Sequence, residues 1–270
     1  MKMKNGRKKS FYVFLIIFLC AVAVGIGYTV KLQSEKKKYE DLAKEAHVTE
    51  MATPTPTPEE TAAPTPESTA APTEEAEKPV IPIDFASLQA ENSEIYAWIQ
   101  IPDTAIDYPV AQRIGDDSYY LNHTIDGAEG LPGSIYTETQ TSMDFSDYNT
   151  VIYGHKMKNG TMFGTLTQYA DPEYMAAHPA IYIYTPDHIF TYEIFAAVTY
   201  DNRHILNSFD FSSTEGRQAY LDSIQNVRNF STHFRDDVQV GTEDRILTLS
   251  TCNGNDDQRF LLEAVLKNEQ

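Results

Sequence analysis

The run from Phe11 to Val30 constrains this chain most, because its twenty consecutive residues carry no charge and most of them are apolar. A helix of that length spans the hydrocarbon core of a bilayer, which is roughly 30 Å thick. Five Lys and Arg residues precede the run within residues 1–10. A cleaved signal peptide is the alternative, but its apolar core is usually shorter, about 7–15 residues. The run predicts a transmembrane signal anchor over residues 11–30.

The segment that follows the span differs in composition from the rest of the chain. Residues 31–50 are typical of a short charged helix, and residues 51–80 are rich in Pro, Thr, Ala and Glu. The second stretch holds almost no large apolar residue, so it predicts an extended spacer rather than a packed unit. The lysines after the span weaken the positive-inside comparison. We therefore place residues 1–10 in the cytoplasm chiefly because of this spacer, with residues 31–80 and a folded domain over 81–270 outside.

Charge and cysteine content narrow the function classes. The chain carries a formal net charge of −18, and residues 81–270 hold 28 acidic against 10 basic residues. Nucleic acid is therefore not an expected partner, because its binding requires cations that displace counterions. The two cysteines, Cys20 in the apolar run and Cys252 near the end, are too few for a disulfide framework and should not pair. An unpaired thiol in an exported domain is a candidate reactive group.

Residues 81–270 have the pattern of one mainly β domain. Asp84 is a plausible N-cap for a first helix. Short runs rich in β-branched and aromatic residues follow, separated by Gly, Pro, Asn and Asp, and they predict strands. These runs are "TVIYGH" (150–155), "AIYIYT" (180–185), "IFTYEIFAAVTY" (189–200), "RILTLSTC" (245–252) and "RFLLEAVL" (259–266). Only residues 214–230 show helical spacing late in the chain.

Cys252 ends one of these strands on the face that it shares with Thr248 and Ser250, opposite the leucines. A buried structural cysteine is the ordinary alternative. A nucleophilic cysteine needs a base or a cation nearby. His155 ends another strand after a glycine that permits a sharp exit, and Arg259 opens the strand after Cys252, so a hairpin would return its guanidinium to the thiol. A surface Arg paired with acidic neighbours remains the alternative for Arg259.

The other histidines carry weaker signals. His47 is expected outside the folded domain, and the remaining five are expected in solvated loops.

The motif "TLSTC" followed by Arg259, with "YGH" upstream, resembles the active-site signature of sortases, the cysteine transpeptidases of Gram-positive cell surfaces. The similarity covers essentially residues 84–267. The stretches "YGHKMKNGTMFGTL" and "TLSTC", and the helical stretch 205–230, resemble class B members.

This resemblance implies an eight-stranded β-barrel with an N-terminal helix and an inserted helix before the cysteine strand, preceded here by the transmembrane helix. It implies that Cys252 attacks a sorting signal and holds it as a thioester, that His155 transfers protons, and that Arg259 steadies the substrate and the oxyanion. Tyr153 and Ser250 match positions near the substrate groove. The implied signal is NPxT[N/G]- or SPxTG-like, and the implied acceptor is a peptidoglycan cross-bridge amine or a pilin lysine.

Three other functions stay open at this point. An exported cysteine peptidase would share the three residues and only hydrolyse. A pilin-polymerising sortase is disfavoured, because no hydrophobic segment follows Leu266 and no Asp-Pro-aromatic lid precedes the domain. A non-catalytic scaffold would explain the spacer but not the placement of Cys252, His155 and Arg259. No acidic loop shows the ligand spacing of a calcium site, so neither a metal nor another cofactor is expected.

Overall fold

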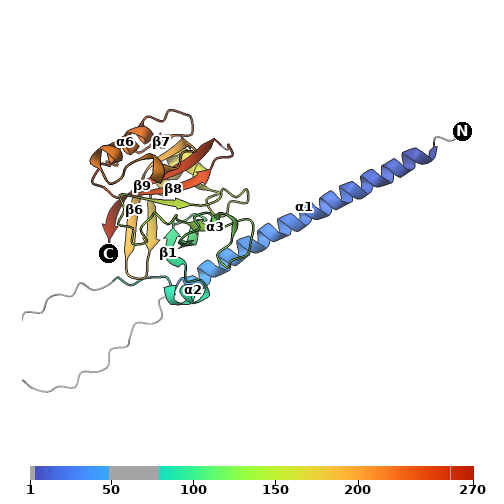
Figure 1. The fold of residues 1–270 in the computed structure, drawn as a ribbon, viewed down its shortest axis with the longest axis horizontal. Helices are drawn as coiled ribbons and strands as arrows, with labels where there is room; N and C mark the ends of the chain where they lie inside the picture. Colours follow the sequence, from blue (N-terminus) through green and yellow to red (C-terminus); the bar gives the residue numbers. More distant parts are fainter. Residues whose placement is uncertain (1–3, 49–78, 256) are drawn as a thin grey trace, which may run out of the picture.

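The computed structural model describes residues 4–48, 79–255 and 257–270 of the chain. Its helices are α1 (Lys4–Ala46), α2 (Phe85–Glu91), α3 (Tyr119–Asn122), the 3-10 helix η1 (Leu166–Ala170), α4 (Pro172–Ala177), α5 (Ile205–Ser208) and α6 (Thr214–Gln225). Its strands are β1 (Ile95–Gln100), β2 (Asp107–Ala111), β3 (Ile135–Tyr136), β4 (Asn149–Tyr153), β5 (Ala180–Tyr184), β6 (Ile189–Asp201), β7 (His233–Phe234), β8 (Ile246–Cys252) and β9 (Gln258–Glu269). Figure 1 shows the strands gathered at the carboxyl-terminal end of the long helix α1.

Eight of the strands close into a barrel. Their hydrogen-bonded order is β5-β1-β2-β3-β4-β8-β9-β6, and β5 pairs again with β6 to complete the ring. The ninth strand, β7, pairs antiparallel with β6 at Ala196 and Ala197. Closure removes the exposed edges that an open sheet would present. The expected eight-stranded barrel is confirmed.

The strand and helix predictions hold in most details. Asp84 caps α2, and its carboxylate accepts a hydrogen bond from the backbone N–H of Ser87 at 3.0 Å. The inserted helix α6 begins at Thr214 as expected but ends at Gln225, five residues before the predicted end at 230. Val227 lies beyond the helix and still packs against the barrel, so the apolar pattern continued past the last turn.

The barrel is packed on both of its surfaces. Leu247 and Leu249 point into the interior core, whereas Ile246 joins a second core that includes Tyr220 and Ile224 of α6. Thr248 therefore lies buried beneath α6, where its hydroxyl is 3.0 Å from the Tyr220 hydroxyl. At Ile246 and Thr248 this face of β8 is a second packed surface, because α6 covers it there.

Helix α1 has an exposed part and a docked part. The side chains of residues 11–30 are exposed, and this helix is long and apolar enough to cross a membrane. Tyr39 and Ala46, further along the same helix, belong to the interior core cluster of the barrel. His47 pairs with Ile83 in an antiparallel bridge, and its ring nitrogen Nε2 lies 2.9 Å from Asp107 Oδ2. The expectation that His47 lies outside the folded domain is wrong.

Candidate active site

The ends of two parallel strands bring His155 and Cys252 to one edge of the barrel. β4 and β8 are neighbours in register, with Tyr153 opposite Ser250. His155 and Cys252 each lie two residues beyond this pair. Thr251 ties the two ends together, since its hydroxyl donates to the carbonyl oxygen of Gly154 at 2.7 Å. The two chain segments therefore leave the barrel side by side.

Arg259 reaches the same edge through a tight hairpin. β8 and β9 pair antiparallel, and Cys252 lies directly opposite Arg259. Gly254 turns the chain with φ +99°, a conformation that L side chains rarely adopt. The side chain of Asn253 supports the turn by donating to Gln258 Oε1 at 3.0 Å. The predicted strand–loop–strand return is confirmed.

His155 lies beyond the end of β4, and a residue of α3 orients its ring. Its Nε2 lies 2.7 Å from the carbonyl oxygen of Leu121. A carbonyl oxygen can only accept, so Nε2 carries the proton and Nδ1 is the ring nitrogen that this contact leaves available. Glycine is required at position 154 because the packing leaves no room for a side chain, and not because the chain turns sharply there. A Cβ there would lie 2.5 Å from Ile135 Cδ1 and 2.8 Å from Phe163 Cδ2.

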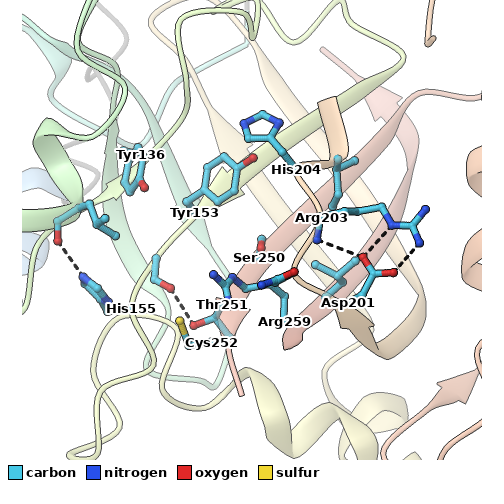
Figure 2. Close-up of a pocket in the computed structure, with 15 residues that line it drawn as sticks. Tyr136, Tyr153, His155, Asp201, Arg203, His204, Ser250, Thr251, Cys252 and Arg259 are labelled. Atoms are coloured by element: carbon cyan, nitrogen blue, oxygen red, sulfur yellow. Dashed lines mark hydrogen bonds and ion pairs between the residues drawn. The ribbon is translucent and has the colours of Figure 1, made fainter. Parts of the chain in front are cut away.

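The three residues line one pocket of about 230 Å³. Figure 2 shows the Cys252 sulfur between His155 and the Arg259 guanidinium in that view. Cys252 is exposed and is a free thiol. A second wall comes from the segment that follows β6, which includes His204 and Ile205. The pocket offers a thiol, an imidazole and a guanidinium to one bound molecule.

Tyr153 and Ser250 also line the pocket, as the sequence comparison implied. Ser250 is buried, and the Tyr153 ring stacks on Tyr136 with centroids 5.5 Å apart. Burial raises the pKa of both phenols well above the usual range, and the Glu138 carboxylate raises each pKa further. Both tyrosines therefore present neutral hydroxyl groups and aromatic faces near neutral pH.

One pair in the pocket region carried no signal in the sequence. His204 Nε2 lies 2.7 Å from Glu138 Oε2, and the Tyr153 hydroxyl reaches the same oxygen at 3.5 Å. The sequence placed His204 among solvated loop histidines, and nothing local pointed to a partner 66 positions away. Only the closure of the barrel brings the segment after β3 beside the segment after β6.

Across residues 4–48, 79–255 and 257–270, no three His, Cys, Asp or Glu side chains are grouped so as to hold a metal ion.

Known proteins are similar to this chain in sequence and in fold. The sortase domain family matches residues 99–267. Sortase B of Listeria monocytogenes is 33% identical over 174 residues, which covers 64% of this chain and 69% of that protein. Sortase B of Staphylococcus aureus is 29% identical over 168 residues, covering 62% and 67% of the two chains.

Solved structures agree with this grouping. A Bacillus anthracis sortase B in complex with AAEK1 superposes with a TM-score of 0.61 at 31% identity, over 71% of this chain and 88% of that one. A Staphylococcus aureus sortase B–substrate complex gives 0.60 at 27% identity, over 68% and 84%. By sequence and by fold, the chain belongs to the sortase family as a sortase B-like cysteine transpeptidase.

Proposed function

We propose that Cys252 is the nucleophile, His155 the proton carrier and Arg259 the oxyanion-stabilising cation of this transpeptidase. The observation that carries the proposal is the register at one barrel edge, where Cys252 lies opposite Arg259 and β4 delivers His155 beside them. A planar guanidinium with several donors suits a negative charge that develops on an acyl oxygen. Tyr153 and Ser250 are proposed to contact the substrate.

The reaction would proceed in two acyl transfers. The Cys252 thiolate attacks the carbonyl carbon of the scissile peptide bond, while imidazolium His155 donates its proton to the departing amine. A thioester remains. The acceptor amine then attacks the thioester carbonyl, neutral His155 takes up the proton that this nitrogen loses, and the thiolate leaves. Arg259 stabilises the oxyanion in both steps, and the enzyme regains its starting protonation.

The proposed substrates are surface proteins with a carboxyl-terminal sorting signal of the NPxT[N/G] or SPxTG kind. The proposed acceptor is a cell-wall amine, a peptidoglycan cross-bridge or a pilin lysine. Relatives support both choices, since one sortase B structure is a substrate complex and another is a complex with triglycine, a peptide with a free amine. The pocket walls combine aromatic rings with His204, which is paired with Glu138 behind it, and this suits a peptide that carries polar side chains.

The location is proposed from helix α1. Its exposed apolar part fits a single-pass signal anchor, with residues 1–10 in the cytoplasm and the barrel outside the cell membrane. A signal peptide passes the same test of length and composition. The continuation of α1 into the core at Tyr39 and Ala46 favours an anchor that stays attached to the folded domain.

The first test is intact-mass spectrometry of the full chain in detergent with peptides of both sorting patterns. We expect a mass gain equal to the amino-terminal peptide fragment, and no gain in Cys252→Ala. Added triglycine should convert the adduct into a joined peptide. Hydrolysed product alone, even with triglycine in excess, would favour a peptidase, and turnover by Cys252→Ala would overturn the mechanism.

A further inference from the structure

The part of α1 beyond the apolar run is built to dock. Leu32, Tyr39 and Ala46 recur at intervals of seven residues and form one stripe of the helix. Tyr39 is 5% exposed and Ala46 is 3% exposed, while Leu32 packs partly buried against the same core. The helix therefore continues from its exposed part into the barrel domain without a break.

The flanks of residues 49–78 are joined to each other. The Val48 backbone N–H donates to the Pro82 carbonyl at 2.9 Å, and the Asp84 N–H donates to the Ala46 carbonyl at 2.9 Å. The chain thus leaves and re-enters the described structure at the same place. The distance between α1 and the barrel is set by these contacts and by the docked stripe, not by the number of residues between them.

Tyr39 binds the backbone of the loop that follows α3. Its hydroxyl donates to the Gly133 carbonyl at 2.9 Å and accepts from the Ile125 N–H at 3.2 Å. Burial raises the pKa of Tyr39 to about 12, so the hydroxyl keeps its proton and acts as a donor. Lys38 adds an ion pair with Asp126 of the same loop. A side chain of α1 thus satisfies two backbone groups that would otherwise be buried without partners.

His155 is held at both ends of this loop. Leu121, in α3 just before the loop, accepts the hydrogen bond from His155 Nε2. Gly133, at its end, has φ +68°, and a Cβ there would lie 3.1 Å from His155 Cδ2 and 2.8 Å from the Leu121 carbonyl oxygen. The Gly133 backbone therefore packs against both the imidazole and the group that orients it. A shift of this peptide would move the ring.

We propose that Tyr39 is a positioning residue for His155, and that the segment of α1 after the apolar run supports the active site through this contact. This inference rests on the proposed proton-transfer role of His155. Tyr39 lies nine positions after Val30, about 14 Å along a helix axis. An anchor at residues 11–30 would then hold the loop after α3, and His155 with it, at a set height above the membrane.

The test compares Tyr39→Phe with Tyr169→Phe in the full chain. Both variants remove one buried hydroxyl that donates to a backbone carbonyl, and Tyr169 donates to His178, outside the pocket. We expect Tyr39→Phe to lower kcat about tenfold with little change in KM, and to displace the pH profile of kcat/KM. Tyr169→Phe should lose comparable thermal stability and keep the wild-type profile.

A second measurement does not depend on the peptide. The rate at which iodoacetamide alkylates Cys252 is measured against pH in a Cys20→Ala background. We expect Tyr39→Phe to change this rate in the same direction as His155→Ala does. If Tyr39→Phe matches the wild type in both measurements while His155→Ala is inactive, the positioning inference is wrong and the proposed mechanism stands. Full turnover by His155→Ala would instead refute the proposed role of His155. If Tyr39→Phe folds poorly, Lys38→Ala replaces it. Lys38→Ala should shift the pH profile of kcat/KM in the same direction by a smaller amount, and a wild-type pH profile would refute the inference.

Discussion

The two sides of the active site are supported in different ways. Cys252 and Arg259 lie opposite each other on paired strands, where ladder hydrogen bonds and the buried body of β8 set their positions. His155 lies beyond β4, and its ring is oriented by the Leu121 carbonyl and by the packing of Gly133. The barrel side, Cys252 and Arg259, is thus fixed by strand pairing, whereas the loop side, His155 and its supporting loop, depends on α1.

The strands thus fix the positions of Cys252 and Arg259, whereas single contacts fix the position of His155. A strand ladder cannot shift one residue without breaking neighbouring hydrogen bonds, so the barrel side should tolerate changes elsewhere in the domain. A loop held by single contacts can move by fractions of an ångström when one contact is lost. Local stability of this kind varies widely within a domain. Substitutions on the two sides should therefore fail in different ways.

The largest effect is expected on the barrel side. Arg259→Lys keeps the charge but not the planar fork of donors, so it should reduce kcat/KM for thioester formation about a hundredfold, nearly as much as Arg259→Ala. Single-turnover kinetics would measure both. A Lys variant within a few fold of the wild type would show that charge alone suffices, and would weaken the argument from the Cys252–Arg259 register.

An intermediate effect is expected on the loop side. Gly133→Ala introduces a Cβ against His155 Cδ2 and the Leu121 carbonyl oxygen, and should lower kcat about tenfold. Gly115→Ala is the matched control, because Gly115 also has a positive φ, +87°, but no atom lies within 4 Å of its added Cβ. Both variants carry similar backbone strain. Equal losses of activity in the two would mean that strain, not the contact with His155, is responsible.

The smallest effect on activity is expected from Glu263, a fully buried carboxyl on β9. Burial raises its pKa to about 8, against 4.5 for a free glutamate, although hydrogen bonds from Thr248 and Tyr220 oppose the rise. Between pH 4.5 and 8 the folded state binds more protons than the unfolded state. The free energy of unfolding should therefore fall as pH rises through this window, by at most about 1.4 kcal/mol per pH unit.

Glu263→Gln keeps a neutral side chain at every pH and should flatten that decline while kcat stays unchanged. Urea unfolding at intervals from pH 5 to 8 would measure the effect, with exposed Glu91→Gln as the control. Parallel curves for the wild type and Glu263→Gln would show that Glu263 is ionised throughout. A loss of kcat in Glu263→Gln would show that the barrel side is less independent of its surroundings than the ladder suggests.

Local patterns in the sequence determined much of this protein. Alternation and turn residues located the strands, Asp84 marked a helix start, and "TLSTC" with "YGH" identified the family and grouped His155, Cys252 and Arg259. These features were readable because each depends on residues close in the chain. The hairpin from Cys252 to Arg259 needed only a short turn between two strands, so its register followed directly.

Only the tertiary structure decided what covers each face. A period of two assigns Thr248 and Ser250 to one face of β8, but nothing local says that α6 covers Thr248 while Ser250 lines the pocket. The seven-residue stripe of Leu32, Tyr39 and Ala46 stands in the sequence, yet its partner is a loop about ninety positions away. The pairing of His204 with Glu138 likewise arises only when the barrel closes. Periodicity determines which side chains share a surface, and long-range packing determines what that surface meets.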